Sequence, residues 1–587
     1  MRFSRLASYL EKLEETTSRN LITEILAEVF REAKPGEIGK LCYLLQGRVA
    51  PLYEAVEFGV AEKFIIRAIA KAYDVPQDEV AYQFKKLGDI GKAAEEIQRG
   101  RPHFAEASRG KGDGGDLKVS QVFDALYEIA VSGGEGSQEK KITFLADLFA
   151  RTDSLSSRYL ARIPLDKLRL GFSETTILDA LSWMLVGDKT LRMRLEDAYN
   201  VRPDIGYVAE TVKKAGIKGL NSVRARVGSP VLAELCQRLP NADEMIKKMG
   251  EVAVEPKYDG VRVQIHYQRT GSRGQGTVKT FSRNLENTTA MFSELSEIGS
   301  ELIAHDVILD CEAVGMDRHG NLVSFQETTT RKRKHDIAAA IKNVPLKFFV
   351  FDILYKNGKD LLATPLVRRR EILEQSLKPR KLLALSPQII THDSVALRTF
   401  HDVQLRKGLE GVVVKKWNSL YEPGRRGYSW VKFKEEEGKT GKLTDTIDAV
   451  VMGYYFGEGK RTGFGIGAFL VGVRRGDGFV TVTKVGTGVS DELWKELRAK
   501  LHAINTRTQP KEYHEVNKLF TPDVWVIPKI VVEIAGDDLT KSSTHGAGFA
   551  VRFPRLVRIR TDKGPREATT ASEMAQMFAG QKSNTKK

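Results

Sequence analysis

The residue with the clearest capacity for chemistry is a lysine in a short turn. Lys257 lies in the segment Glu255-Pro-Lys-Tyr-Asp-Gly-Val-Arg262, where Asp259-Gly260 can form the turn between two strands. A lysine amine attacks phosphorus only when it is neutral, and an ordinary lysine is neutral in only about one molecule in 10³–10⁴ near pH 7. Burial and neighbouring cations favour the neutral amine. Taken alone, the segment equally predicts an ordinary hairpin.

Two further lysines alternate with apolar residues in Trp430-Val-Lys-Phe-Lys434. The period of two in a strand places Lys432 and Lys434 on one face and Val431 and Phe433 on the other. Two ammonium groups side by side repel each other unless an anion such as phosphate lies between them. The alternative is an edge strand whose solvated lysines discourage aggregation.

Two glutamates are candidate metal ligands. Glu410 precedes the apolar run Gly411–Val414, and Glu312 lies in Leu309-Asp-Cys-Glu-Ala313. A divalent metal that serves phosphate chemistry is held by carboxylates that leave coordination positions open for phosphate oxygens and water. Acidic residues at strand ends are more often simply solvated, so both assignments depend on the surrounding motifs.

The elements that must position these residues change in character along the chain. From Met1 to about Leu220, apolar residues recur at helical spacing, as in Phe3, Leu6, Leu10 and Leu13, and the segment 110–115 predicts an exposed loop. After Gly228 the residues 261–268 alternate between apolar and polar, as in a strand. More strands are predicted at 278–282, 307–314, 347–354 and 411–415, with a helical segment at 367–375, which together indicate an α/β domain.

The last part of the chain is predicted to be rich in β-structure. The charged segment 435–444 is interpreted as a hinge. Beyond it, short alternating strands with turns at Gly453, 457–467 and 476–478 are typical of a small β-barrel. The segment Arg331-Lys-Arg-Lys334 predicts a basic loop that is solvated or touches a DNA backbone.

Composition favours a polyanionic partner and excludes several classes of protein. The 587 residues include 92 Lys and Arg against 76 Asp and Glu, a net charge of +16, which favours nucleic acid or an anionic membrane surface as partner. Cys42, Cys236 and Cys311 are too far apart for a CxxC pair, which excludes a disulfide scaffold and a four-cysteine zinc site. No apolar run reaches the roughly 18 residues of a membrane helix, so we expect a soluble, intracellular protein without a membrane partner.

Seven motifs follow one another in order along the chain. They are Glu255-Pro-Lys-Tyr-Asp-Gly-Val-Arg262, Phe281-Ser-Arg-Asn284, Leu309-Asp-Cys-Glu-Ala313, Phe349-Val-Phe-Asp352, Glu410-Gly-Val-Val-Val-Lys415, Trp430-Val-Lys-Phe-Lys434 and Arg552-Phe-Pro-Arg555. This series resembles the covalent nucleotidyltransferase superfamily of polynucleotide ligases and RNA capping enzymes, and within it the archaeal type of ATP-dependent DNA ligase. The resemblance covers nearly the whole chain, because the segments 87–91, 168–171 and 203–206 are similar to the DNA-binding domain that precedes the catalytic core of such ligases.

The resemblance implies a multidomain fold and a reaction. It places an all-α DNA-binding domain over 1–224, an α/β nucleotidyltransferase (adenylation) domain over 225–436, and a β-barrel OB-fold domain with a basic C-terminal tail over 437–587. It implies a DNA ligase that uses ATP and Mg²⁺ to seal nicks in duplex DNA. Lys257 attacks ATP to form lysine-AMP and release pyrophosphate, AMP passes to the 5′-phosphate of the nick, and the 3′-hydroxyl then displaces AMP.

The resemblance also implies roles for charged and aromatic residues around the nucleotide. With Lys257 as the nucleophile, the implied nucleotide and 5′-phosphate site consists of Glu255, Arg262, Arg283, Glu312, Phe351, Arg426, Lys432, Lys434, Arg552 and Arg555. Within it, Phe351 stacks on the base, Glu312 lies beside the ribose, and the arginines suit phosphate because their forks bind its oxygens in pairs. The implied metal ligands are Glu410 and Glu312.

Two alternative functions remain open from the sequence. An RNA ligase or a capping-type guanylyltransferase uses the same lysine chemistry, although the helical first third argues against both. A DNA-binding scaffold with an inactive core is disfavoured, because every charged motif position is present. The expected partner is nicked duplex DNA, and analogy suggests a sliding clamp. We expect a monomer in the cytoplasm, associated with the nucleoid.

Overall fold

The computed structural model describes residues 1–100, 117–168, 170–271, 275–323, 327–328, 331, 344–378, 381–434, 446–457 and 459–583. The predicted loop at 110–115 and the predicted hinge at 435–444 lie outside them. The described chain forms two compact units. The first contains residues 1–239, 243–397 and 413–432, and the second contains 240–242, 398–412 and the described residues from Phe433 onward. Among the described helices, none combines the length and apolar character of a membrane span.

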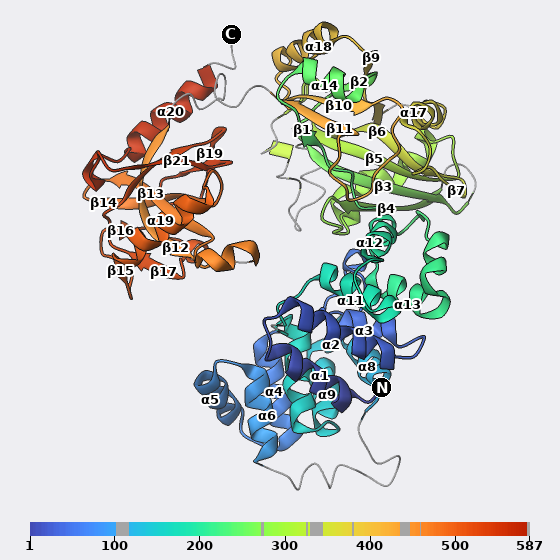
Figure 1. The fold of residues 1–587 in the computed structure, drawn as a ribbon, viewed down its shortest axis with the longest axis vertical. Helices are drawn as coiled ribbons and strands as arrows, with labels where there is room; N and C mark the ends of the chain where they lie inside the picture. Colours follow the sequence, from blue (N-terminus) through green and yellow to red (C-terminus); the bar gives the residue numbers. More distant parts are fainter. Residues whose placement is uncertain are drawn as a thin grey trace. The chain divides into compact units, whose positions relative to one another are not determined.

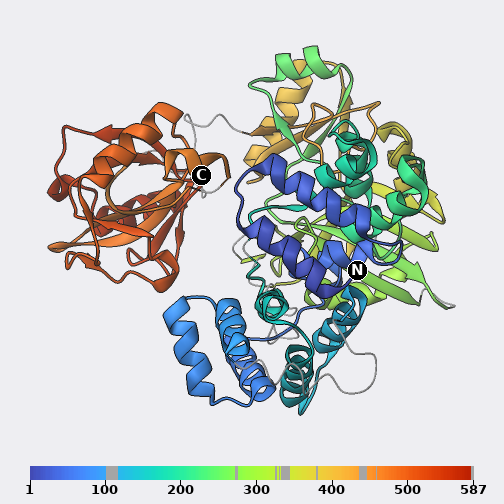
Figure 2. The same ribbon diagram turned by 60° about the horizontal axis from the view of Figure 1, so that its bottom comes forward.

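In the described part of residues 1–222 the regular elements are helices, as predicted (Figures 1 and 2). The helices are α1 (Phe3–Glu14), α2 (Arg19–Glu32), α3 (Ile38–Leu44), α4 (Glu62–Tyr73), α5 (Gln77–Leu87), α6 (Ile90–Arg99), α8 (Val119–Val131), α9 (Ser137–Ala150), α10 (Ser154–Arg162), α11 (Glu174–Val186), α12 (Arg192–Val201) and α13 (Ile205–Ala215). The helical spacing of α1 buries Phe3, Leu6, Leu10 and Leu13 in one core shared by the bundle.

Two of the helical motifs begin helices that pack unusually closely. Asp89 and Asp204 are the N-caps of α6 and α13, where each carboxylate accepts the backbone N–H three residues on. The glycines that follow permit close contact: a Cβ on Gly91 would lie 2.4 Å from the carbonyl oxygen of Arg158, and one on Gly206 would lie 2.5 Å from the ring of Tyr43. These motifs therefore determine helix starts and helix packing in this region.

The region after the helices is a mixed α/β structure, as predicted. Its elements are β1 (Gln237–Arg238), α14 (Ala242–Met249), β2 (Val252–Pro256), β3 (Val261–Arg269), β4 (Gly276–Ser282), β5 (Asp306–Gly315), β6 (Leu346–Lys356), β7 (Lys359–Asp360), α17 (Leu366–Glu374), β8 (Leu383–Leu385), β9 (Ile389–Thr391), α18 (Ser394–Arg406), β10 (Gly411–Lys416) and β11 (Trp430–Lys434). One sheet has the order β1-β11-β10-β2-β9, and a second has β4-β3-β5-β6-β7 with β8 beside β6. The β2–β3 connection, which carries Lys257, joins the two sheets.

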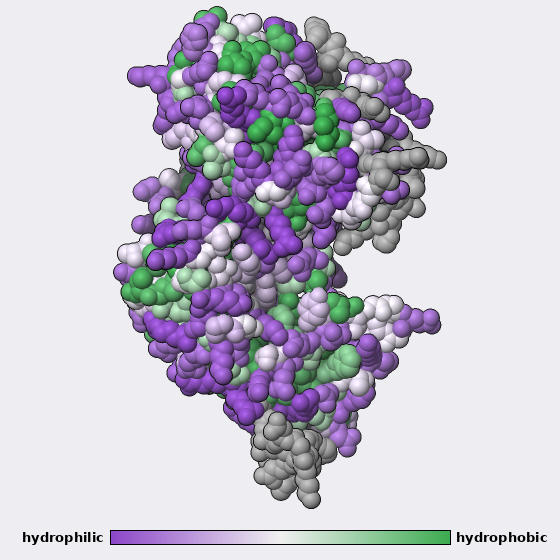
Figure 3. All heavy atoms as spheres, turned by 90° about the vertical axis from the view of Figure 1, so that its right-hand side faces the viewer, coloured by the Kyte–Doolittle hydropathy of each residue, from purple (hydrophilic) through white to green (hydrophobic). Residues whose placement is uncertain are grey.

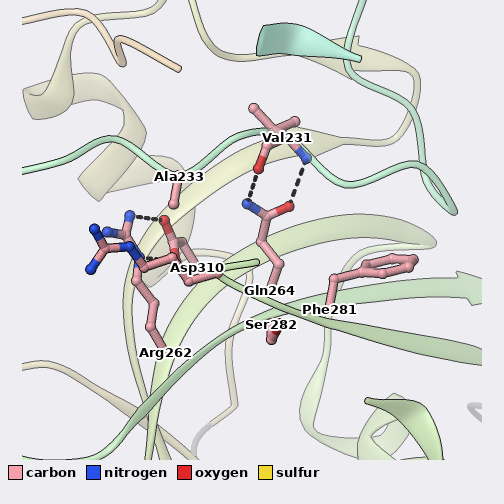
Figure 4. Close-up of a pocket in the computed structure, with 8 residues that line it drawn as sticks. Val231, Ala233, Arg262, Gln264, Phe281, Ser282 and Asp310 are labelled. Carbon is pink, nitrogen blue, oxygen red and sulfur yellow. Dashed lines mark hydrogen bonds and ion pairs between the residues drawn. The ribbon is translucent and has the colours of Figure 1, made fainter. Parts of the chain in front are cut away.

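The polar face of β3 is buried beneath the segment that leads in from the helices. Gln264 is 6% exposed and His266 is fully buried. The amide of Gln264 both donates to the carbonyl of Val231 (2.7 Å) and accepts from its N–H (2.9 Å), as Figure 4 shows. The N–H of Gly228 donates to His266 Nδ1 (3.1 Å). Residues 228–234 therefore lie along β3, bound by successive side chains of that one face.

Because His266 Nδ1 accepts a hydrogen bond, the ring must be neutral, and burial lowers its pKa to about 3. Below pH 6.5, about the ordinary pKa of histidine, His266 binds a proton in the unfolded chain but not in the folded chain. The free energy of unfolding should therefore fall as the pH drops from 6.5 toward 3, by up to about 1.4 kcal/mol per pH unit from this group. Urea unfolding at pH 6.5 and 5.0 should show this loss in the wild type.

The variant His266→Asn isolates the contribution of the imidazole. Asparagine keeps a hydrogen-bond acceptor for Gly228 but does not titrate. The difference between wild type and variant should change by about 2 kcal/mol between the two pH values. Equal pH dependence of the two proteins would contradict a neutral, buried His266.

The second unit is mainly β-structure, in orange and red in Figure 1. Its later elements are β12 (Ile447–Tyr455), β13 (Ala468–Arg475), β14 (Gly478–Val485), α19 (Asp491–His502), β15 (Asn505–Thr506), β16 (Tyr513–His514), β17 (Val524–Val526), β18 (Val531–Ala535), β19 (Asp538–Lys541), β20 (Phe549–Arg552), β21 (Arg555–Arg560) and α20 (Ala571–Ser583). The turn predicted at Gly453 is wrong, because β12 continues through this residue with a register shift against β13. A Cβ there would lie 2.5 Å from Pro522, so close packing explains this glycine.

Figure 3 shows hydrophilic residues over most of one face, with hydrophobic residues scattered among them.

Arg331, which the sequence predicts in a basic surface loop, is buried. Arg331 is 3% exposed and forms an ion pair with Glu294 at 2.5 Å, so the prediction of a solvated or DNA-facing loop is wrong at this residue. Its buried charge is retained because a carboxylate compensates it. Residues 332–334 lie outside the described residues.

Candidate active site

The loop that carries Lys257 is held against strand β5. Gly260 is what permits this contact, because a Cβ at this position would lie 2.5 Å from the carbonyl oxygen of Ala313 and 2.9 Å from Cγ of Glu312. Tyr258 is buried and stacks on Phe349 at 4.2 Å between ring centroids. Lys257 itself is half-buried. The glycine of the turn signal therefore also brings the loop that carries the lysine against Glu312 of β5.

A buried ion pair lies directly behind this loop. Lys415 (1% exposed) donates from Nζ to Glu255 Oε1 at 2.8 Å, and Glu255 is 3% exposed. Lys415 Nζ also donates to the carbonyl oxygen of Phe351 (3.2 Å) and lies 4.7 Å from the ring centroid of Phe351. Burial raises the pKa of Glu255, and the ammonium group of Lys415 limits this rise. The pair thereby links β10 to β2, which ends just before Lys257, and to β6, which carries Phe351.

Arg262 is fixed by a set of acceptors around its guanidinium group. Nε and Nη2 donate to the two carboxylate oxygens of Asp310 at 3.0 and 2.7 Å, and Nη1 donates to the carbonyl oxygen of Glu234 at 2.7 Å. Tyr421 donates to the same Asp310 carboxylate at 2.9 Å. Nearby lies the pocket of Figure 4, lined by Val231, Ala233, Arg262, Gln264, Phe281, Ser282, Arg283 and Asp310.

Glu234 is a buried carboxyl group on the same segment. Oε1 accepts from Ser429 Oγ (2.6 Å) and Oε2 accepts from the backbone N–H of Glu422 (2.9 Å). Burial raises the pKa of Glu234 to about 7, and these two hydrogen bonds oppose the rise. Glu234 thus joins the segment beneath β3 to the loop between β10 and β11.

Two cations, Arg262 and Lys415, lie near the rings of Phe351 and Trp430. Burial raises the pKa of the Cys236 thiol, and the positive charges of Arg262, Lys257 and Lys415 oppose that rise. Trp430 lies here as well, with Lys415 Nζ 4.3 Å from its ring centroid. Trp430 is 2% exposed, and its Nε1–H has no partner among the described residues. The cations together with the free Nε1–H donor of Trp430 suit an anionic ligand that carries hydrogen-bond acceptors.

The candidate metal ligands are the carboxylates of Glu312 and Glu410, which suit a metal ion that is held mainly by phosphate oxygens. No group of three or more His, Cys, Asp or Glu residues gathers as a metal site in the described part of the chain. Mg²⁺ bound with phosphates needs only one or two protein carboxylates. Glu312 is half-buried beside the Lys257 loop and fits this requirement. Glu410, half-buried immediately before β10, belongs to the second unit.

Lys432 of β11 follows the predicted alternation. Val431 and Phe433 are buried, whereas Lys432 is half-buried and is paired in register with Arg238 of β1. The side chain of Lys434 lies outside the described side chains.

Two predicted phosphate-binding arginines are exposed. Arg283 lies in a tight loop in which the hydroxyl of Ser282 accepts the N–H groups of Asn284 and Glu286. Arg426 lies in the loop between β10 and β11. Neither forms an ion pair with another described residue, so both guanidinium groups remain available to an anion.

The predicted arginines of the second unit lie around a short turn. Arg552 ends β20 and Arg555 begins β21, with Phe553 between them at a φ of 51°. Arg555 forms an ion pair with Asp537 at 2.9 Å. Arg552 lies 5.2 Å from the ring centroid of Phe553.

Four residues of the site were not predicted from the sequence: Lys415, Asp310, Tyr421 and Trp430. Lys415 and Trp430 belong to quoted motifs, and a lysine that closes an apolar strand was a usable signal for a buried cation. Asp310 also belongs to a quoted motif, but neither it nor Tyr421 gave such a signal, because their importance comes from contacts with Arg262 across 48 and 159 residues of sequence.

Three family models match the chain. They are described as DNA ligase N terminus (residues 2–182), ATP dependent DNA ligase domain (230–434) and ATP dependent DNA ligase C terminal region (462–563). A probable DNA ligase of Dictyoglomus turgidum is 41% identical over 594 residues, which cover 99% of this chain and 98% of the relative. A DNA ligase of Pyrobaculum neutrophilum is 37% identical over 600 residues, which cover 99% of each chain.

The fold is also similar to a solved structure named Pmar-Lig_PreS3. The likeness has a TM-score of 0.50 at 17% identity and covers 94% of this chain and 99% of that one. At this identity it supports the order of helical, mixed and β-rich regions along the chain.

Proposed function

The chain belongs to the family of ATP-dependent DNA ligases, and from this premise we propose how its residues carry the reaction. The enzyme uses ATP and seals nicks in duplex DNA. We assign the nucleophile to Lys257. The observation that carries this assignment is the loop itself, which Gly260 holds against β5 beside Glu312 and which directly follows Glu255, the partner of the buried Lys415.

The surroundings of Lys257 favour attack on a nucleotide. Positive charges on the neighbouring residues attract the triphosphate. The half-buried ring of Phe351, edged by Trp430 at 5.9 Å, offers a surface on which a base can stack. Glu255, held by Lys415, and the unused donor of Trp430 supply polar contacts at the same place. These residues would orient the nucleotide with its α-phosphorus toward the amine.

We assign different residues to the metal, to the nucleotide phosphates and to the 5′-phosphate of the nick. Glu312 and Glu410 would hold Mg²⁺, which neutralises phosphate charge when bound. Lys432 and Lys434 would bind nucleotide phosphate from β11, and Arg552 and Arg555 would orient the leaving pyrophosphate. Arg283 and Arg426, exposed and unpaired among the described residues, would bind the 5′-phosphate of the nick.

Further proposals concern the whole chain. We propose three functional domains over 1–224, 225–436 and 437–587, with the segment 435–444 as the hinge between the last two. We propose a monomer that acts in the cytoplasm beside the chromosome, because its substrate is there. A sliding clamp is proposed as a partner by analogy alone.

Sealing of a nicked DNA duplex with a 5′-phosphate tests the proposal. We expect joined product with ATP and Mg²⁺, loss of product when EDTA removes the metal, and at least about a hundredfold slower joining when RNA replaces both strands at the nick. Joining measured on denaturing gels decides the outcome. Full activity in EDTA would contradict the proposed metal, and preferential joining of RNA would contradict the proposed substrate.

A further inference from the structure

The loop between β10 and β11 is held from two sides. On one side, Glu422 and Ser429 bind the carboxylate of Glu234, at 2.9 and 2.6 Å. A Cβ on Gly427 would lie 2.6 Å from a carboxylate oxygen of Glu422, so the loop also packs closely on itself. Arg426, the proposed ligand of the 5′-phosphate, lies within this loop.

The other side of the loop is bound to the helical region. Arg425 Nη2 and Asp197 Oδ1, from α12, form an ion pair at 2.6 Å, and Glu196 lies 3.8 Å from Nη1. A Cβ on Gly424 would lie 2.8 Å from the side-chain amide of Asn200, and φ at Gly424 is 69°. Arg425 is 30% exposed and Asp197 is 64% exposed, so this ion pair contributes little to global stability.

Backbone hydrogen bonds connect α12, the intervening segment and the loop. The N–H of Leu232 donates to the carbonyl oxygen of Asn200 (2.9 Å), and the carbonyl oxygen of Leu232 accepts from Gly424 N–H (3.2 Å). The N–H of Leu235 donates to the carbonyl oxygen of Arg425 (2.9 Å). The end of α12 and the loop are therefore bonded through one short stretch of chain.

We propose that Asp197 and Arg425 are positioning residues for nick sealing, which act by holding the loop that presents Arg426. The ion pair anchors the backbone next to Arg426 to a helix, while the Arg426 guanidinium group stays exposed. The helical region then contributes to the site of phosphate binding as well as to DNA affinity. This inference rests on the proposed role of Arg426.

The test compares two steps of the reaction in the full-length chain. The variants are Asp197→Asn, Arg425→Gln and the double variant. Because small misplacements of a binding group are costly, we expect each single variant to slow transfer of the adenylate to nicked DNA about tenfold. We expect the double variant to be no slower than the slower single variant, because both changes remove one interaction. Formation of the protein adenylate, followed by intact mass, should stay within about twofold of wild type.

A matched control is Glu139→Gln, which removes the exposed ion pair between Glu139 and Arg67 elsewhere on the helical region. It changes net charge by the same amount as Asp197→Asn and should leave transfer unchanged. Transfer rates for Asp197→Asn within twofold of this control would overturn the inference, as would multiplying effects in the double variant. A wild-type chain that forms no adenylate would instead refute the proposed function. Normal transfer in Arg426→Ala together with slow transfer in Asp197→Asn would show that Asp197 acts by another route and would also overturn the inference.

Discussion

The variant Lys257→Ala should form no protein adenylate at all. In the proposed reaction the amine of Lys257 makes the covalent bond to AMP, and alanine offers no nucleophile in its place. After incubation with ATP and Mg²⁺, the intact mass of the wild-type chain should rise by one adenylate, and the mass of the variant should not change. Joining of a nick in the presence of ATP should be lost with it.

Lys416→Ala provides the matched control, because Lys416 is an exposed lysine on β10 next to the buried Lys415. It should acquire the adenylate normally. A nick that already carries AMP on its 5′-phosphate bypasses the missing step, so Lys257→Ala should still join such a nick slowly. Labelling of the variant at the wild-type rate would show that another residue is the nucleophile and would remove the basis of the proposed mechanism.

Local periodicity predicted most of the elements that surround Lys257. The alternation in 261–268 and in 430–434 predicted strands, because side chains of a strand point alternately to opposite faces. It also predicted that Val431 and Phe433 share one face of the strand and that Lys432 lies on the other, and in β11 the first two are buried while Lys432 is half-buried. Gly453 failed as a turn signal, because glycine also occurs inside strands where another backbone or ring comes close.

Contacts between distant segments could not be predicted in this way. Arg262, Gln264 and His266 were recognised as the polar face of a strand, but nothing in the pattern indicated that residues 228–234 would cover that face. Burial changes the chemistry of these side chains, since a covered polar group requires a hydrogen-bond partner. The same reason applies to Glu255 and Lys415, which are 160 residues apart in sequence and meet only because β2 and β10 are neighbours in one sheet.

The second large effect is expected from Lys415→Met. Methionine fills a similar volume but leaves the Glu255 carboxylate, which is 3% exposed, without its cation. Removal of one partner of a buried ion pair typically costs about 3–5 kcal/mol, because the remaining charge is desolvated and unpaired. The urea midpoint of the first unit should fall accordingly. Adenylate formation should fall as well, since Lys415 also holds the carbonyl of Phe351.

The double variant Glu255→Gln with Lys415→Met separates stability from function. It carries no buried charge at this position, and neutral replacements of buried ion pairs are often tolerated. Its urea midpoint should therefore recover most of the loss, while the KM for ATP stays raised because the polar contact from Glu255 and the cation of Lys415 are both missing. If the free energy of unfolding of Lys415→Met were within about 1 kcal/mol of the wild-type value, Glu255 and Lys415 would not form the buried ion pair described here. Recovery of the KM in the double variant would show that the pair supports the fold and does not contact the nucleotide.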